Sequence, residues 1–330
     1  MDPAQFFAAS RLVIVAGKGG VGKTTVSAAL ARAASKEGLS SLIIEVEGKS
    51  GLAAMFDQPS FSYDEVELLP AGENPVSGPV RARTLTPDDA LLDYLQNAGM
   101  NRISKRLLAS GALDMVSTAV PGIRDILVLG KVKQLERATA ADLLILDAPA
   151  AGHAISFLQS ASGLADAVRL GPINTQARDV LDLLGDPSRC QVVLVTLPEE
   201  TPVNELIDTA YQLEDRVGVS LGPVVVNGLY DDLPGLDADP EAAADAAGAS
   251  LRAGEADELR AAAEFRRERT GLQLQQTARL LDALPLPQLR LPYVFDAEIG
   301  PAQLDLLAGS LLAGIHEVDA AALGQPEAAR

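Results

Sequence analysis

Residues 17–25 constrain the fold of this chain more than any other part of the sequence. They read Gly-Lys-Gly-Gly-Val-Gly-Lys-Thr-Thr and match the phosphate-binding loop (P-loop) pattern G-x-x-x-x-G-K-[ST]. An apolar run, Leu12–Ala16, precedes this loop, and a helical pattern, Lys23–Lys36, follows it. Backbone N–H groups at the start of a helix can surround an anion. The sequence therefore predicts a phosphate site between the first strand and the helix that follows it.

Each residue type in the loop suits a nucleotide phosphate and its metal ion. The glycines allow successive N–H groups to turn toward one small volume. Lys23 supplies a positive charge for the β and γ phosphates, and the hydroxyl of Thr24 can bind Mg²⁺. The predicted nucleotide contacts in this loop are Gly17, Lys18, Gly19, Gly20, Val21, Gly22, Lys23, Thr24 and Thr25.

Apolar runs alternate with helical patterns along the rest of the chain. These runs are continuous in Val, Ile and Leu, which is typical of strands that have helices on both faces of their sheet. We therefore predict an α/β fold of the P-loop NTPase type over residues 1–330, with a mostly parallel sheet covered by helices on both faces. The expected strands are Leu12–Ala16, Ser41–Val46, Leu143–Asp147, Val192–Leu197 and Pro223–Asn227, and two further expected helices are Ile123–Arg137 and Glu200–Val217.

Three stretches depart from this alternation. Residues 58–122 begin with a Pro- and Gly-containing passage and continue as helical material that Thr86-Pro87-Asp88-Asp89 opens, which predicts a helical insertion between strands. Residues 231–258 hold nine acidic residues and one basic residue, and we expect a solvated linker or an exposed helix face rather than a binding site. A helix is predicted for residues 260–284, ended by Pro285 and Pro287, and the tail 317–330 is expected to be flexible.

The charge of the chain excludes some kinds of partner. Its 45 acidic and 27 basic residues give a net charge of −18, which repels phosphate backbones and anionic lipids, so we expect no nucleic-acid partner. We expect no secretory signal, because the first residues are not basic and no long apolar stretch follows them, and no membrane span, because no apolar run is long enough. The expected location is the cytoplasm. Cys190 is the only cysteine, so a disulfide within the chain and a cysteine-bound zinc site are not expected.

Lys18 is a second lysine in the loop, directly after the first glycine. In this form the loop resembles that of the arsenite-transport and tail-anchored-protein-targeting ATPase family, the deviant P-loop ATPases. The resemblance implies ATP or ADP as ligand, Mg²⁺ as metal, and a dimer in which Lys18 reaches the nucleotide of the partner subunit. A cation from a second subunit can neutralise charge on the transferring phosphate. The alternative is a solvated loop lysine.

Two later segments resemble the same family. Residues 143–153 are similar to its D-T-A-P-T-G-H segment, which implies that Asp147 holds Mg²⁺ through water and that Gly152 lies in a loop sensing the γ phosphate. Residues 224–228 are similar to its strand-to-Asn element, which implies that the amide of Asn227 reads the adenine edge. The alternatives are a helix-capping or turn aspartate for Asp147 and a left-handed turn residue for Asn227.

The sequence departs from the family after the second expected strand. The family has a D-P-A-H segment there, whereas this chain has Glu45-Val46-Glu47-Gly48-Lys49-Ser50. Alignment on Leu52 and Phe56 makes Glu47 the candidate for positioning the attacking water; the alternative is that Glu45 and Glu47 are solvated or pair with Lys49. The cysteine sites of the family are also absent, so arsenite is not the expected substrate.

These observations lead to one main functional hypothesis and two alternatives. The main one is an ATP-hydrolysing dimeric switch, a homodimer or a heterodimer with a paralogue, in which nucleotide state controls a protein client bound at the helical insertion. Lys18, Lys23, Glu47 and Asp147 are its expected catalytic residues. The alternatives are a low-turnover regulatory subunit paired with a paralogous ATPase and a subunit of an anion pump.

Overall fold

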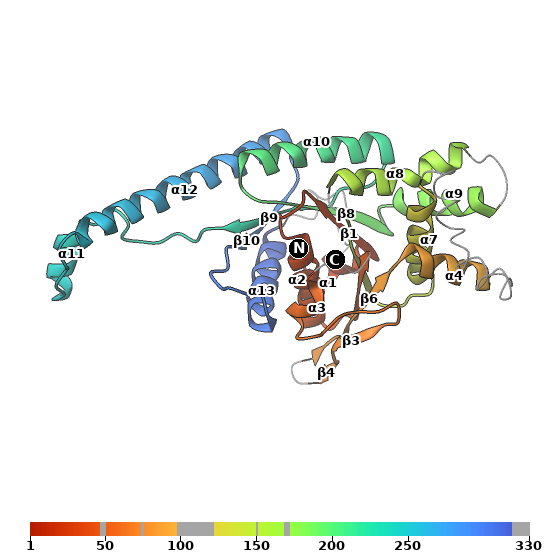
Figure 1. Ribbon diagram of the computed structural model, residues 1–330, viewed down its shortest axis with the longest axis horizontal. Helices are drawn as coiled ribbons and strands as arrows, with labels where there is room; N and C mark the ends of the chain where they lie inside the picture. The colour runs from red at the N-terminus through yellow and green to blue at the C-terminus, as the bar shows by residue number, and fades with distance from the viewer. Residues whose placement is uncertain (47–50, 74–75, 98–121, 150, 168–171, 319–330) are drawn as a thin grey trace.

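A computed structural model describes residues 1–46, 51–73, 76–97, 122–149, 151–167 and 172–318 (Figure 1). Its main strands are β1 (Leu12–Gly17), β2 (Ser41–Val46), β3 (Val66–Leu69), β6 (Val80–Leu85), β7 (Leu143–Asp147), β8 (Cys190–Thr196), β9 (Val224–Leu229) and β10 (Gln288–Pro292). They form one sheet in the order β10-β9-β8-β1-β7-β2-β6-β3. Within this sheet β3 runs antiparallel to its neighbour, and the other pairs are parallel. A small hairpin contains β4 (Gly72–Glu73) and β5 (Val76–Ser77).

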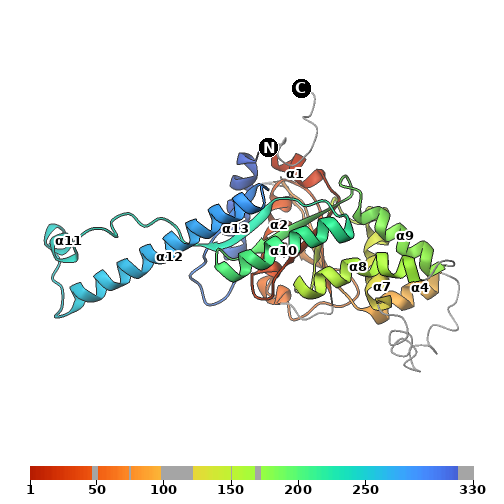
Figure 2. The same cartoon turned by 90° about the horizontal axis from the view of Figure 1, so that it is seen from above.

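Helices cover both faces of the sheet (Figures 1 and 2). One face packs against α1 (Pro3–Ala8), α2 (Lys23–Lys36), α3 (Leu52–Met55) and α13 (Pro301–Glu317). The other packs against α7 (Ile123–Arg137), α8 (Ala151–Ala167), α9 (Pro172–Leu184), α10 (Glu200–Val217) and the end of α12 (Glu255–Ala283). The remaining described helices are α4 (Pro87–Asn97) and α11 (Pro240–Ala247).

The central strands are mostly apolar because their two faces contribute to two separate cores. In β1, Leu12 and Ile14 belong to the core under α7 and α8, whereas Val13 and Val15 belong to the core under α2 and α13. Alternate residues of a strand point to opposite faces, so a strand covered on both sides has no polar face. The predicted mostly parallel α/β sheet is confirmed, and each expected strand lies within one residue of its predicted start or end except at two boundaries: β8 begins two residues earlier, at Cys190, and β9 extends to Leu229.

The prediction of a helical insertion over residues 58–122 is wrong for its first half. The described part of this half contains the strands β3, β4, β5 and β6, and β3 and β6 extend the main sheet beyond β2. The apolar positions of β6 alternate with two arginines, Arg81 and Arg83, so its pattern is weaker than that of the central strands. The helical part begins at α4, where Asp89 N–H donates to Thr86 Oγ1 (3.2 Å) and the Thr86 hydroxyl donates to Asp89 Oδ2 (2.6 Å), as predicted. Residues 98–121 lie outside the described part.

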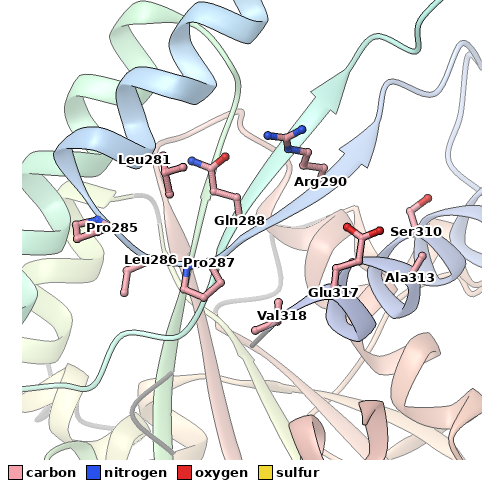
Figure 3. Close-up of a pocket in the computed structure, with 11 residues that line it drawn as sticks. Leu281, Pro285, Leu286, Pro287, Gln288, Arg290, Ser310, Ala313, Glu317 and Val318 are labelled. Carbon is pink, nitrogen blue, oxygen red and sulfur yellow. The ribbon is translucent and has the colours of Figure 1, made fainter. Parts of the chain in front are cut away.

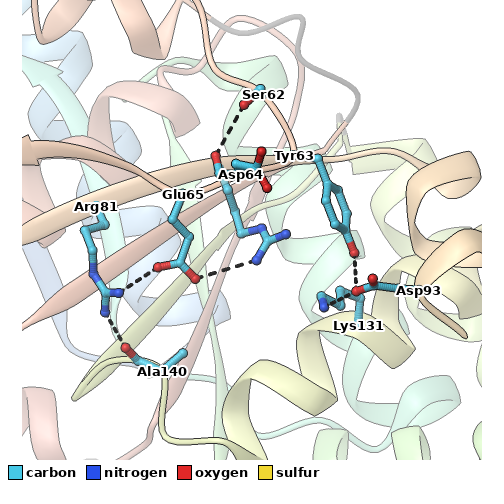
Figure 4. A network of polar contacts seen from close by, with 9 residues as sticks. Ser62, Tyr63, Asp64, Glu65, Arg81, Asp93, Lys131 and Ala140 are labelled. Carbon is cyan, nitrogen blue, oxygen red and sulfur yellow. Dashed lines mark hydrogen bonds and ion pairs between the residues drawn. The ribbon is translucent and has the colours of Figure 1, made fainter. Parts of the chain in front are cut away.

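A polar network joins the start of this helical part to the sheet edge (Figure 4). The Tyr63 hydroxyl, just before β3, donates to Asp93 Oδ2 on α4 at 2.6 Å, and Lys131 on α7 pairs with the same carboxylate. Arg83 lies over the ring of Tyr63, 4.4 Å from its centroid. Burial, together with the hydrogen bond to Asp93, raises the pKa of Tyr63. α4 is therefore held against both α7 and the β3–β6 edge.

At the opposite end of the molecule, residues 231–272 form an arm that extends away from the body (Figures 1 and 2). The arm consists of the segment after β9, α11 and the first two thirds of α12. The predicted helix at residues 260–284 is present, but it begins earlier, at Glu255, and ends at Ala283. α13 continues to Glu317, so the first residue of the expected tail is helical, and residues 319–330 lie outside the described part.

Candidate functional site

The phosphate loop has the predicted strand-loop-helix setting. β1 ends at Gly17, and α2 begins at Lys23. A Cβ on Gly17 would lie 2.3 Å from the backbone oxygen of Val195, so β8 leaves no space for a side chain there. Gly20 has φ +84° and no atom within 4 Å of its potential Cβ, so the loop opens on that side. These contacts fix the loop against β8 and leave its outer side accessible to a ligand.

Lys23 points back over the loop. Its Nζ donates to the carbonyl oxygen of Lys18 at 3.0 Å. Burial lowers the pKa of Lys23, and the nearby carboxylate of Asp147 opposes that shift. A partly desolvated ammonium at the N-terminus of a helix is well suited to contact phosphate oxygens.

Asp147 lies at the end of β7 and faces the first turns of α2. The Thr24 hydroxyl donates to its Oδ2 at 2.7 Å, and the Ser27 hydroxyl donates to its Oδ1 at 3.4 Å. Burial raises the pKa of Asp147, although the hydrogen bond from Thr24 and the charge of Lys23 oppose the shift. The carboxylate is in strand β7 and bonds to these two side chains of α2, so it is neither a helix cap nor a turn residue.

Glu45 is a second buried carboxylate, and sequence reasoning did not assign it to the site. It lies in β2, in register with Asp147 on one side and with Thr84 of β6 on the other. The Thr84 hydroxyl donates to Glu45 Oε2 at 2.8 Å. Only 4% of Glu45 is exposed, so the alternative that it is solvated is wrong. In the sequence, Glu45 could have been noticed by its position directly after the apolar run 42–44.

Lys18 is not free in the single chain. Its Nζ lies 2.7 Å from Oε1 of Glu205, which is on α10. Both side chains are more than a third exposed, so this ion pair is accessible to water. No sequence pattern indicated this contact, because Glu205 is 187 residues away and lies within an ordinary helical pattern.

Asn227 contacts the phosphate loop directly. Its Nδ2 donates to the carbonyl oxygen of Val21 at 2.9 Å and would lie 2.3 Å from a Cβ on Gly22. Asn227 belongs to β9, and its φ is not positive, so the left-handed turn alternative is wrong; Gly228 takes that conformation instead.

The end of β9 also contacts α12. The side chain of Gln273 on α12 donates to the Gly228 carbonyl at 3.1 Å and accepts from the Tyr230 N–H at 2.8 Å. The loop, the end of β9 and the base of the arm are thus in contact.

Of the remaining predicted residues, some lie at or near the phosphate loop and others lie outside the described part of the chain. Thr25 lies in the first turn of α2, and Gly19 is exposed in the loop. Gly152 is the second residue of α8, so it follows β7 at the same end of the sheet as the phosphate loop. Glu47 and Lys49 lie outside the described residues.

The donor set fits a magnesium ion that is held mainly by phosphate and water. Among the described residues, no three His, Cys, Asp or Glu side chains gather as a metal site. The hydroxyl of Thr24 and the carboxylate of Asp147 are oxygen donors in contact with each other. Mg²⁺ prefers oxygen ligands and often binds proteins through only one or two side chains plus phosphates. The Thr24–Asp147 pair therefore suits this metal, with phosphate and water supplying the other ligands.

A separate cavity of about 770 Å³ lies at the free edge of β10 (Figure 3). It lies between the end of α12 and α13 and is lined by Leu281, Gln288, Arg290 and Glu317, among others. None of the predicted site residues contributes to it. It is therefore distinct from the phosphate loop.

Comparisons with known proteins identify the family of this chain. Residues 10–170 match a family described as anion-transporting ATPase. The chain is 32% identical to "ATPase BagA" of Mycobacterium tuberculosis over 307 residues, which cover 87% of this chain and 88% of that protein. The same figures hold for "Putative ATPase Mb3704" of Mycobacterium bovis.

More distant similarity extends to two other named groups. The chain is 25% identical to a "Putative arsenical pump-driving ATPase" of Halobacterium salinarum, over 68% of this chain and 36% of that protein. It is 28% identical to "ATPase get3" of Neurospora crassa, over 60% of this chain and 55% of that protein. No helix among the described residues combines the length and the apolar character needed to cross a membrane.

Proposed function

Since this chain is an ATPase of the anion-transporting ATPase family, we propose that it works as a nucleotide-dependent dimeric switch that controls the binding of a protein client or partner. The observation that carries this proposal is the combination of a P-loop with a second lysine, Lys18, that lies at the surface. A surface cation beside the phosphate loop can serve a nucleotide in a second subunit, as an arginine finger does.

Each residue of the site has a role in this proposal. The N–H groups of residues 17–22 and the ammonium of Lys23 hold the phosphates and oppose the negative charge that the reaction concentrates there. Thr24 would bind Mg²⁺ directly, and Asp147 would hold it through water; the ion supplies charge neutralisation at the β and γ phosphates. Asn227 would exchange its bond to Val21 for the adenine edge. Glu47 is proposed to orient the attacking water.

Two measurements test the switch. Lys23→Ala should lower ATP hydrolysis at least about a hundredfold, because it removes a charge that contacts the reacting phosphate. Unchanged hydrolysis in this variant would contradict the assignment of the site. The mass of the protein in solution, measured with and without a non-hydrolysable ATP analogue, should double with the analogue in the wild type and remain that of a monomer in Lys18→Ala.

One observation favours the regulatory-subunit alternative. The segment Glu45-Val46-Glu47-Gly48 replaces the D-P-A-H of the family, and the longer glutamate displaces a water-orienting carboxylate by about one bond length. In a low-turnover subunit, Glu47→Gln would leave the hydrolysis rate unchanged. In an active ATPase, the same change would lower the rate at least about tenfold.

The structure disfavours an arsenite-type pump subunit. Cys190 is fully buried in β8, and burial raises the pKa of its thiol to about 12. A protonated, buried thiol is a poor ligand for a metalloid. We therefore place the client or partner among proteins, and stimulation of hydrolysis by arsenite would contradict this choice.

A further inference from the structure

The arm formed by residues 231–272 contributes almost nothing to the core. No residue of α11 is buried, and the only buried residues of α12 are Gln273, Thr277 and Leu280, all in its last third. Figures 1 and 2 show that α12 begins at the outer end of the arm, beside α11, and runs back to the body, where its last third is anchored. A helix without a packed face is only marginally stable in water. The outer part of α12 is therefore available to another surface.

One side of this outer helix has the spacing of a helix-packing seam. Glu258, Ala261, Phe265, Glu268 and Leu272 follow each other at intervals of three and four residues, so they lie on one side of α12. All five are exposed, and the two large apolar members, Phe265 and Leu272, are 64% and 51% exposed. We call these five residues the seam. Large apolar side chains repeated along one side of a solvent-exposed helix are typical of an interaction surface.

The charges around the seam indicate what it would bind. The arginines of α12 nearest to it already have partners: Arg260 pairs with Asp239 and Asp257, Arg267 pairs with Asp237, and Arg269 pairs with Glu199. Arg266 lies over the ring of Tyr230, 4.1 Å from its centroid. These positive charges are therefore already engaged within the chain.

The glutamates along the same side of the helix are in a different situation. Within the described part of the chain, no ion pair reaches Glu258, Glu264 or Glu268. The seam therefore presents apolar side chains flanked by glutamates that form no ion pair within the described part of the chain. Its complement is a helix with an apolar stripe bordered by lysine or arginine.

We propose that the seam is a docking surface for a basic amphipathic helix of a partner protein. Phe265 and Leu272 supply the apolar contact, and Glu258, Glu264 and Glu268 pair with basic residues on its borders. The anchored end of α12, where Gln273 bonds to Gly228 and Tyr230, keeps the surface at a fixed position relative to the sheet. This surface is separate from the helical part at α4 and α7, where the sequence placed a client.

A synthetic helix can test the proposal on the full-length protein. The probe is an amphipathic peptide of about 18 residues, five helical turns, with leucine on one side and lysine on the other. Its binding is measured by fluorescence anisotropy at two salt concentrations. The double variant Phe265→Ser, Leu272→Ser should weaken binding at least about tenfold, and Glu258→Gln with Glu268→Gln should weaken it several-fold at low salt.

Matched controls separate the seam from general attraction to an acidic protein. Leu274 and Leu281 are exposed leucines of the same helix outside the seam, 58% and 49% exposed, and their double change to serine should leave binding unchanged. Glu214→Gln with Asp215→Asn on α10 removes the same charge elsewhere. If either control weakens binding as much as its seam counterpart, the peptide is attracted by overall charge and the proposal is wrong.

Two further outcomes would also overturn the proposal. If a peptide in which glutamate replaces lysine binds as tightly as the lysine peptide, the glutamates of the seam do not select a basic partner. A smaller solution mass of Phe265→Ser, Leu272→Ser than of the wild type, in the absence of peptide and nucleotide, would show that a second copy of the chain occupies the seam.

Discussion

The phosphate loop and the arm are both glycine-containing, charged and accessible, yet different forces hold them in place. The loop is packed between β8, β9 and α2, with Lys23 bonded to the backbone oxygen of Lys18 and Thr24 bonded to Asp147. The arm is held by the buried end of α12 and by ion pairs between exposed side chains. Such pairs contribute little to stability. The comparison indicates that the loop is a rigid part of the fold, whereas the arm is an appendage that the fold does not require.

Two leucines of α12 test this difference within a single helix. Leu280 is 1% exposed in the main core, whereas Leu272 is 51% exposed on the arm. Leu280→Ala should lower the free energy of unfolding by about 3 kcal/mol, because it leaves a cavity, and Leu272→Ala should change it by less than about 0.5 kcal/mol. Chemical denaturation measures both. A comparable loss in the two variants would mean that the arm is part of the core.

Two glycines test the difference between the loop and the arm through the backbone. Gly17→Ala places a Cβ 2.3 Å from the oxygen of Val195, and relieving this clash requires β1 to move away from β8. We expect a loss of about 2 kcal/mol together with a loss of nucleotide binding. Gly254, before α12, has φ +85° with nothing within 4 Å of its potential Cβ, so Gly254→Ala should cost only the local strain of about 1 kcal/mol.

Calorimetry of ATP binding to the two glycine variants completes this test. Gly254→Ala should bind ATP as the wild type does, since only Gly17 belongs to the loop. If Gly254→Ala binds ATP as poorly as Gly17→Ala does, the conformation of the loop depends on that of the arm.

The sequence was sufficient for the features that depend on local pattern. The loop 17–25 specifies a strand before it and a helix after it, and the continuous apolar runs specify strands covered on both faces. The resemblance to the ATPase family assigned Asp147, at the end of such a run, to the same site as the loop, and the structure places its carboxylate in contact with Thr24. These features follow from residues that are close in sequence or from the rule that a strand covered on both faces of its sheet is an apolar run.

The features that the sequence could not supply depend on residues brought together from distant segments. Glu45 becomes buried only because β6 adds Thr84 beside it, and the strand pattern of β6 is interrupted by arginines. Glu205 of α10 meets Lys18 at the end of β1. The acidic composition of the arm predicts a linker or an exposed helix face, but composition does not indicate which side of α12 packs on the body.

A third prediction concerns the buried charge in the site. Burial raises the pKa of Asp147, so the native state takes up a proton more readily there than the unfolded chain does. The stability contributed by this group is therefore complete below the ordinary aspartate pKa and is lost as the pH rises through the native value. The amide introduced by Asp147→Asn carries no charge at any pH. This variant should therefore be more stable than the wild type at pH 7, by roughly 1 kcal/mol, while its hydrolysis falls.

Thermal unfolding from pH 7 down to about pH 4 measures this difference. The advantage of Asp147→Asn should shrink as the pH falls, since the wild-type carboxyl becomes neutral as well. The matching change on the arm, Asp237→Asn, removes an exposed partner of Arg267 and should not stabilise the protein at any pH. A constant advantage across this range would mean that the variant acts through packing instead of charge.

The smallest effect is expected at Glu205, which resembles the arm in being exposed but contacts the loop. Glu205→Gln breaks an ion pair between partly exposed groups, so the free energy of unfolding should change by less than about 1 kcal/mol. If Lys18 serves a second subunit, the loss of its local partner should favour the dimer, and ATP-dependent association should occur at a several-fold lower protein concentration. Arg269 pairs with Glu199 at the start of α10, so Glu199→Gln is the matched control and should leave association unchanged. Weaker association in Glu205→Gln would mean that Glu205 positions Lys18 for the partner subunit, and the loop would then depend on α10 for its function although its packing depends on β8, β9 and α2.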